Sequence, residues 1–176
     1  YLWHKNVIAV PDREIVGGRY STACYISDSW PSLLYLAFKY RNDPKAALLA
    51  NTDLVLLDIK AGNAALYEKV SGGGRLSDVL DFSARLVEHR VAVWIRVVLV
   101  SGLTDAPVQI AEVSDLAADL GEIVERVEVL PYHRLGIDKY AALGRAYPLL
   151  GTPTPSKESV DQALAIFRER GLYTLA

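Results

Sequence analysis

Cysteine and methionine are the residues that this sequence most clearly lacks. Its 176 residues include one cysteine, Cys24, and no methionine. A single cysteine excludes an internal disulfide. It also does not by itself supply a zinc or iron–sulfur site, because such sites usually need three or four protein ligands. Since the chain opens on Tyr1 rather than Met, we expect it to be a fragment or a trimmed form of a longer protein.

An excess of charge of one sign is lacking as well. The 19 Lys and Arg residues nearly balance the 21 Asp and Glu residues, so nucleic-acid binding has no electrostatic support. The longest apolar run is interrupted by Arg96 and is too short to cross a bilayer. The first residues lack the basic and apolar segments of a signal peptide. We therefore expect one cytoplasmic domain with a full core and without nucleic-acid or membrane partners.

Three apolar runs, at residues 54–57, 91–100 and 127–130, predict buried β-strands. Amphipathic helices are predicted between and after them, starting near residues 105–107 and 155–156 and ending at Gly121 and Gly171. Their apolar faces consist of Leu76, Val79, Leu80, Leu86 and Val87, then Val113, Leu116, Ala117 and Leu120, then Val160, Ala163, Leu164 and Phe167. This alternation indicates parallel strands with right-handed crossovers, in an open doubly wound sheet or in part of a β/α barrel.

The remaining segments give weaker signals. Strands at 7–10 and 22–26, helices at 31–40 and 43–50, and a turn at Gly17-Gly18 are predicted for the first 50 residues. Residues 71–74 are predicted to be a flexible connection, because they lack the lysine of a phosphate-binding loop. Residues 138–140 are predicted to form a solvated loop.

Polar residues follow the predicted strands at their carboxyl ends, where both parallel architectures place their sites. Asp58 and Lys60 follow the first strand, and their side chains point to the same side because strand side chains alternate. A carboxylate beside an ammonium suits a polar ligand. A strand-terminal ion pair of small energy is the alternative, and the spacing alone slightly favours it.

Arg96 is surrounded by apolar residues within the second predicted strand. Burying a guanidinium without a partner is costly, so Arg96 needs an acid or a polar cavity. The sequence leaves two interpretations open. Arg96 either pairs with an acid such as Asp58, or it lines a pocket and binds a carboxylate or phosphate.

His133 follows the third predicted strand, after Pro131, which cannot donate to a sheet. A lone histidine is more often structural or exposed than functional. The polar ends of the neighbouring strands nevertheless make His133 a candidate site residue. Its neighbour Tyr132 is predicted to pack against the protein rather than to act in a site.

Several segments resemble the activating enzymes of pyruvate formate-lyase, which are radical S-adenosylmethionine (SAM) proteins. The segments are TDLVLLDIK (52–60), VAVWIRVVLVSGLTD (91–105) and VEVLPYHRLGIDKYAALG (127–144), together with the tail PSKESVDQALAIFRERGLYTL (155–175). They occur in order from about Asp43 to the C-terminus, so the similarity covers roughly three quarters of the chain.

This resemblance implies an α/β fold, the C-terminal part of a partial β/α (TIM-like, radical SAM) barrel with parallel strands. It implies SAM and a [4Fe-4S] cluster as cofactors, and reductive cleavage of SAM to a radical that abstracts hydrogen from a glycine of a partner. The partner would be a glycyl radical enzyme such as pyruvate formate-lyase, with an electron donor such as flavodoxin. By the same resemblance, Asp58, Ile59, Lys60 and His133 contact SAM, and Arg96 lines the site.

The first 42 residues depart from the family pattern. The family's CxxxCxxC motif is absent, and VGGRY (16–20) has the glycines but not the acid of the Gly-Gly-Glu segment that meets the SAM amino group. Asp28 is out of register with the family's Asp-Thr-Ser/Asn-Gly strand end. We therefore expect a single domain, 1–176, with an atypical segment at 1–42, barrel elements at 43–176, part of the SAM site, and no metal ligands.

Two alternatives to an activating enzyme remain open. The chain could be a non-catalytic fragment that binds SAM or a partner, or an inert domain. It could also be a barrel lyase that uses Lys60 as a Schiff-base amine, although no other feature of the sequence favours this. Such a lysine would have to be desolvated, because the chemistry requires a lowered pKa.

Overall fold

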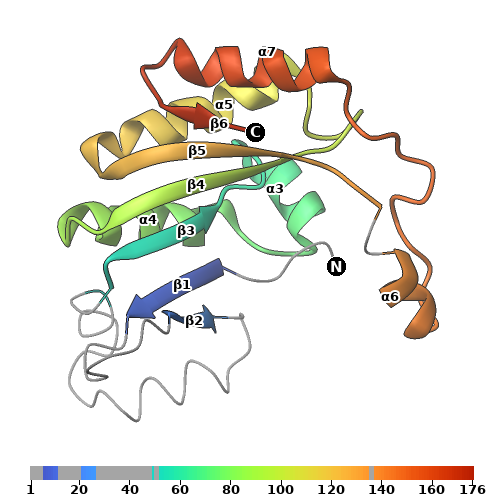
Figure 1. Ribbon diagram of the computed structural model, residues 1–176, viewed down its shortest axis with the longest axis horizontal. Helices are drawn as coiled ribbons and strands as arrows, with labels where there is room; N and C mark the ends of the chain where they lie inside the picture. Colours follow the sequence, from blue (N-terminus) through green and yellow to red (C-terminus); the bar gives the residue numbers. More distant parts are fainter. Residues whose placement is uncertain (1–5, 12–20, 27–48, 50–51, 135–136) are drawn as a thin grey trace.

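A single six-stranded sheet organises the chain (Figure 1), in the order β2-β1-β3-β4-β5-β6. The computed structural model describes residues 6–11, 21–26, 49, 52–134 and 137–176. The strands are β1 Asn6–Pro11, β2 Ser21–Ile26, β3 Leu54–Asp58, β4 Ala92–Leu99, β5 Val124–Pro131 and β6 Thr174–Leu175. Strands β3 to β6 are mutually parallel, whereas β1 runs antiparallel to both β2 and β3.

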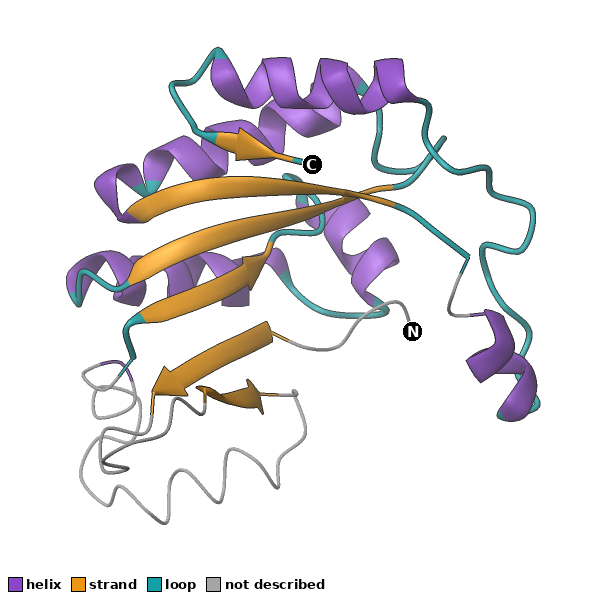
Figure 2. Cartoon of the chain, viewed as in Figure 1, coloured by secondary structure: helices purple, strands orange, loops and turns teal. Residues whose placement is uncertain are grey.

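Helices α3 Ala64–Ser71, α4 Leu76–Glu88, α5 Pro107–Asp119 and α7 Lys157–Arg168 connect the parallel strands and cover one face of the sheet (Figure 2). A 3-10 turn, η1, lies at Gly121–Ile123, and the short helix α6, Ile137–Ala142, lies beyond the end of β5, away from this layer. Four parallel strands thus alternate with helices that lie on one side of the sheet. The predicted α/β class with parallel strands is therefore confirmed.

The core lies between the helices and this face of the sheet. Strand residues at alternate positions are almost completely buried there, as the period of a strand requires. They are Val55 and Leu57 of β3 with Ile59 just beyond its end, then Val93, Ile95, Val97 and Leu99 of β4, and Val127 and Val129 of β5. Phe167 of α7 is fully buried among them. The opposite face, here called the inner face, carries the intervening residues, and no helix of the described ranges packs on it.

Most predicted elements are confirmed, with changes at their ends. The strands predicted at 7–10, 22–26, 54–57, 91–100 and 127–130 are all present. Helix α5 begins with Pro107 as its first residue, and Ser156 caps α7 by accepting from the amide of Ser159 at 3.2 Å. The predicted helix at 31–40 and the turn at Gly17-Gly18 lie outside the described residues. Of the predicted helix 43–50 only Leu49 is described, and it is helical and buried.

One local prediction was wrong: residues 138–140 belong to α6 rather than to a loop. On the predicted apolar face of α4, Leu80 and Val87 are 39% and 43% exposed, because this face is wider than the surface that the sheet covers. Residues 71–74 comprise the end of α3 and the start of its connection to α4. Gly72 adopts a left-handed conformation there, and the Ser71 hydroxyl accepts from the amide of Gly74 at 2.8 Å. The flexibility expected of this connection stays a prediction.

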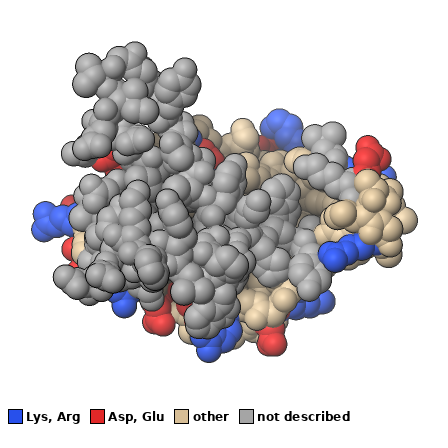
Figure 3. All heavy atoms as spheres, turned by 90° about the horizontal axis from the view of Figure 1, so that it is seen from below, with Lys and Arg blue, Asp and Glu red and all other residues tan. Residues whose placement is uncertain are grey.

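Charge on the surface is mixed in sign. In the view of Figure 3, Lys and Arg side chains alternate with Asp and Glu side chains around the rim of the described residues. Within the described part of the chain, no helix has the length and apolar character needed to span a membrane. The cytoplasmic location expected from the sequence stays a prediction.

Candidate site on the inner face of the sheet

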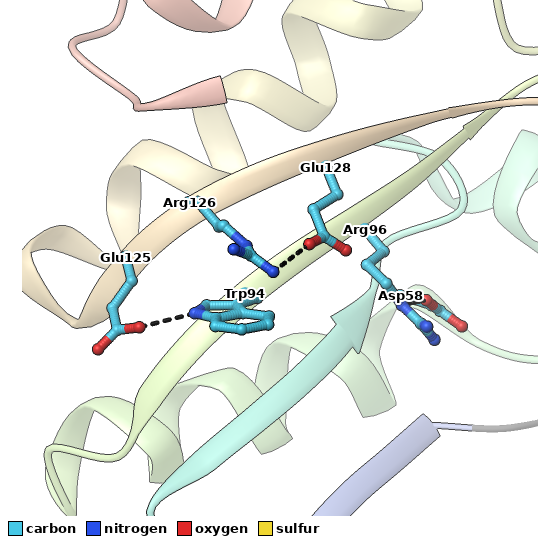
Figure 4. Close-up of polar contacts among 6 residues, drawn as sticks. All are labelled: Asp58, Trp94, Arg96, Glu125, Arg126 and Glu128. Atoms are coloured by element: carbon cyan, nitrogen blue, oxygen red, sulfur yellow. Dashed lines mark hydrogen bonds and ion pairs between the residues drawn. The ribbon is translucent and has the colours of Figure 1, made fainter. Parts of the chain in front are cut away.

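A group of charged and aromatic side chains occupies the inner face where β3, β4 and β5 run side by side (Figure 4). Asp58 comes from β3, Trp94 and Arg96 from β4, and Arg126 and Glu128 from β5. In the register of the sheet, Arg96 lies directly opposite Asp58 on one neighbour and Glu128 on the other. Trp94 lies opposite Arg126 in the same way. Strand alternation places all of them on one face, because the residues between them fill the core.

Asp58 and Arg96 form an ion pair across β3 and β4. The Nε of Arg96 donates to Oδ1 of Asp58 at 2.8 Å, and the two side chains are 22% and 11% exposed, respectively. This contact confirms the interpretation in which Arg96 pairs with Asp58. It does not test the other interpretation, binding of an anion, because a one-point contact through Nε engages only one side of the guanidinium.

Burial raises the pKa of Asp58 above its ordinary value. The positive charge of Arg96, its hydrogen bond and the charge of Lys60 act in the opposite direction and offset part of this effect. Arg96 and Lys60 therefore offset part of the free-energy cost of burying the Asp58 carboxylate. A cationic or hydroxyl group of a ligand is expected to stabilise this carboxylate further.

Lys60 and Ile59 lie immediately beyond the carboxyl end of β3. Lys60 is half-buried and close enough to Asp58 to influence its pKa. Ile59 differs, because its side chain is 1% exposed and belongs to the core, and its amide donates to the carbonyl of Arg96 at 3.1 Å. Any contact between Ile59 and a cofactor would therefore involve its backbone and not its side chain.

His133 lies beyond the carboxyl end of β5 and is exposed. It lies farther along the chain than the level of the Asp58–Arg96 pair, because Glu128 of β5 is opposite Arg96 and Pro131 is already opposite Leu99. The structure thus brings Asp58, Lys60 and Arg96 together and places His133 at the same end of the sheet, farther along. Tyr132 packs as predicted: it is 4% exposed, and its hydroxyl donates to the carbonyl of Leu149 at 3.2 Å.

The remaining members of the group were missed in the sequence. The guanidinium carbon of Arg126 lies 3.2 Å from the centroid of the Trp94 ring, and Nη2 of Arg126 contacts Oε1 of Glu128 at 2.5 Å. The indole Nε1 of Trp94 donates to Oε2 of Glu125 at 2.6 Å. The sequence held one signal for Arg126 and Glu128. Charged and apolar residues alternate from Arg126 to Val129, which places Arg126 and Glu128 on the side of the strand opposite Val127 and Val129.

A shift of register explains how Glu125 reaches Trp94. Val93 pairs with Val124, whereas Trp94 pairs with Arg126, so Glu125 is an extra residue in β5. A bulge of this kind redirects a side chain that regular alternation would send to the other face. Arg126 carries a cost in this arrangement, because its Nε is buried without a hydrogen-bond partner among the described residues.

Metal ligands do not gather in the described part of the chain. No group of three or more His, Cys, Asp or Glu residues there is arranged to hold a metal ion. The single cysteine, Cys24, lies in β2. The described residues therefore do not fit a [4Fe-4S] cluster, whereas the acid, lysine and arginine at the end of β3 and in β4 fit the charged amino-acid portion of SAM.

Comparison with curated proteins shows extended sequence similarity to activating enzymes. The chain is 36% identical over 135 residues to the pyruvate formate-lyase 1-activating enzyme of Escherichia coli, which covers 76% of this chain and 54% of the relative. It is 39% identical over 132 residues to the pyruvate formate-lyase-activating enzyme of Streptococcus mutans, covering 72% of this chain and 49% of the relative. No family model matches the chain.

Comparison with solved structures shows the same fold. A domain of a pyruvate-formate lyase-activating enzyme from Bacteroides vulgatus superposes with a TM-score of 0.60 at 23% identity, covering 77% of this chain and 73% of that one. A radical SAM methyltransferase from Sphaerobacter thermophilus superposes with a TM-score of 0.53 at 18% identity, covering 68% of this chain and 32% of that one. The chain is thus homologous to proteins of which it spans about half the length.

Proposed function

We propose that this chain, a homologue of the pyruvate formate-lyase activating enzymes, is the SAM-binding C-terminal part of a glycyl-radical-enzyme activating enzyme. The observation that carries the proposal is the Asp58–Arg96 pair on the inner face of the sheet. Both residues lie in the part of this chain that is similar to the activating enzymes. Sites in parallel β/α architectures lie at the carboxyl ends of the strands, and both residues are at or near that end.

Specific roles follow from the charges. In SAM, the amino-acid end carries a carboxylate and an ammonium, and the ribose offers hydroxyls. Lys60 and the outer nitrogens of Arg96 suit the carboxylate, whereas Asp58 suits a cationic group or a hydroxyl. His133, at the end of β5, suits the nucleoside portion, because an imidazole both accepts and donates hydrogen bonds. When bound, SAM would supply the radical chemistry of the family.

The whole reaction requires more than the described residues. A [4Fe-4S] cluster would need thiolates that one cysteine does not supply. The partner in our proposal is a glycyl radical enzyme such as pyruvate formate-lyase, and the electron donor is a protein such as flavodoxin. A cytoplasmic location fits both partners.

Calorimetric titration with SAM tests the proposal on the 176-residue chain itself. We expect measurable binding, and we expect Asp58→Ala and Lys60→Ala each to weaken it by about tenfold, as for loss of a hydrogen-bonded charged group. Lys69→Ala is the matched control, because Lys69 is exposed at the end of α3. Failure of the wild-type chain to bind SAM, or equal affinity of the Lys60→Ala variant and the wild type, would overturn the proposal.

A further inference from the structure

Arg96 lies between two carboxylates but contacts only one of them. Asp58 on β3 and Glu128 on β5 are both directly opposite Arg96 in the register of the sheet, on the same face. Its recorded contact among the described residues is with Asp58 at 2.8 Å. Figure 4 shows the Arg96 side chain directed toward Asp58 and away from Glu128. Glu128 is thus not paired with Arg96, the cation directly opposite it on the neighbouring strand.

Glu128 is paired with Arg126 instead. Arg126 lies two residues before Glu128 on the same strand face, and its Nη2 contacts the Glu128 carboxylate at 2.5 Å. The contact satisfies Glu128 locally, within β5. A carboxylate that is already paired with a guanidinium has less to gain from a second one, since part of its charge is neutralised.

Arg126 is itself held in place. Its guanidinium is stacked on the Trp94 ring, 3.2 Å from the centroid, and is only partly exposed. The indole is held in turn by the hydrogen bond from Nε1 to Glu125, the extra residue of β5. Glu125, Trp94, Arg126 and Glu128 thus form a continuous chain of contacts, which we call the inner-face support (Figure 4).

We propose that Arg126 is a positioning residue that withdraws Glu128 from Arg96, so that the outer nitrogens of Arg96 stay available to the carboxylate of an amino-acid-bearing ligand. The inference rests on the proposed function, since that ligand is SAM. Without Arg126, Glu128 would be a carboxylate attached to the neighbouring strand at high effective concentration. It would then compete with the ligand for the same guanidinium. The inner-face support therefore affects the binding of the SAM carboxylate and does not affect the binding of the nucleoside portion of SAM.

The test compares two ligands on three variants. Arg126→Met keeps an unbranched apolar side chain beside Trp94 but removes the guanidinium and its charge. We expect it to weaken SAM binding by about tenfold while leaving affinity for 5′-methylthioadenosine, which lacks the amino-acid portion, within about twofold. Addition of Glu128→Gln to this variant should restore most of the lost SAM affinity. Arg75→Gln, which removes an exposed arginine at the start of α4, should change neither affinity.

The double variant separates positioning from a general structural role. A merely destabilised sheet would lose affinity for both ligands, and a second substitution would not restore it. The inference is therefore overturned if Arg126→Met leaves SAM affinity unchanged, if it weakens both ligands equally, or if Glu128→Gln fails to restore binding.

A measurement without ligand makes the result independent of the proposed function. The coupling between Arg96 and Glu128 is obtained from the unfolding constants of Arg96→Met, Glu128→Gln and the double variant. We expect a coupling below about twofold in the wild-type background and above about fivefold in the Arg126→Met background, where the two residues would pair. Equal coupling in both backgrounds would overturn the inference. If the wild type bound neither ligand, the proposed function would fail and this coupling alone would decide.

Discussion

Replacement of Gly62 by alanine is expected to force apart two segments next to the site. Gly62 follows Lys60 and Ala61 in the connection from β3 to α3. A Cβ atom at Gly62 would lie 2.3 Å from the Cβ of Glu112 and 2.6 and 2.7 Å from backbone atoms of Glu112 and Val113 in α5. Carbon atoms in contact are normally about 3.5–4.0 Å apart, so the connection and α5 would have to separate by about 1 Å.

The cost follows from the kind of atom that must move. Two of the three neighbours are backbone atoms of a helix, which cannot rotate away as a flexible side chain does. Asn63, which caps α3, also donates to the Glu112 carboxylate at 2.7 Å and would be displaced. Inserted carbon atoms in packed regions typically cost about 1–3 kcal/mol, and we expect about 3 kcal/mol here. The corresponding fall in Tm is roughly 6–12 °C for a chain of this size.

Thermal and urea unfolding of Gly62→Ala measure this cost directly. Gly151→Ala is the matched control, because a Cβ at Gly151 would meet no atom within 4 Å. We expect the control to stay within about 0.5 kcal/mol of the wild type. If Gly62→Ala were equally neutral, the close approach of the β3–α3 connection to α5 would be refuted. The position of Lys60, which depends on that connection, would then also be in doubt.

Three further predictions concern the core, the support of Tyr132 and the pH dependence of Asp58. Phe167→Ala should lower the free energy of unfolding by about 3–5 kcal/mol in urea, because Phe167 is fully buried, and a loss below about 1 kcal/mol would contradict this placement. Tyr132→Phe should cost about 1 kcal/mol in the same assay, through loss of the hydrogen bond to Leu149, and no loss would argue against that bond. Burial raises the pKa of Asp58 in the folded protein, so the contribution of this group to stability is fully present below its ordinary value of 3.8 and is lost as pH rises through the folded value. The wild type should therefore gain stability relative to Asp58→Asn as pH is lowered from neutral, and a constant difference or the opposite trend would contradict the assignment.

The parallel strands could be predicted because their sequence pattern matches their environment. Val93, Ile95 and Val97 belong to a strongly apolar run, which favours burial. Signals for the covering helices are also present, with Pro107 in the first turn of α5 and Ser156 as the N-cap of α7. The exposure of Leu80 could not be predicted in this way. A helical wheel gives the width of an apolar stripe, but not how much of that stripe the sheet will cover.

The site could be predicted only in part. Asp58, Lys60 and Arg96 stand out in the sequence as polar residues in or after apolar runs, and a parallel sheet in register brings the acid and the arginine together. The inner-face support could not be found in this way, because it depends on the bulge that redirects Glu125. An insertion of one residue in a strand has no sequence signature, since its position depends on the pairing with a neighbouring strand.

Amide chemical shifts recorded during a titration with SAM would show whether the chain binds SAM and which residues contact it. At 19.3 kDa the labelled chain is suited to such a titration. We expect the largest changes on residues 58–60, on Arg96 and on His133, with small changes on α4 and α5. Changes concentrated in the apolar groove that Leu80, Val87 and Leu116 line between α4 and α5, or no changes at all, would contradict this expectation.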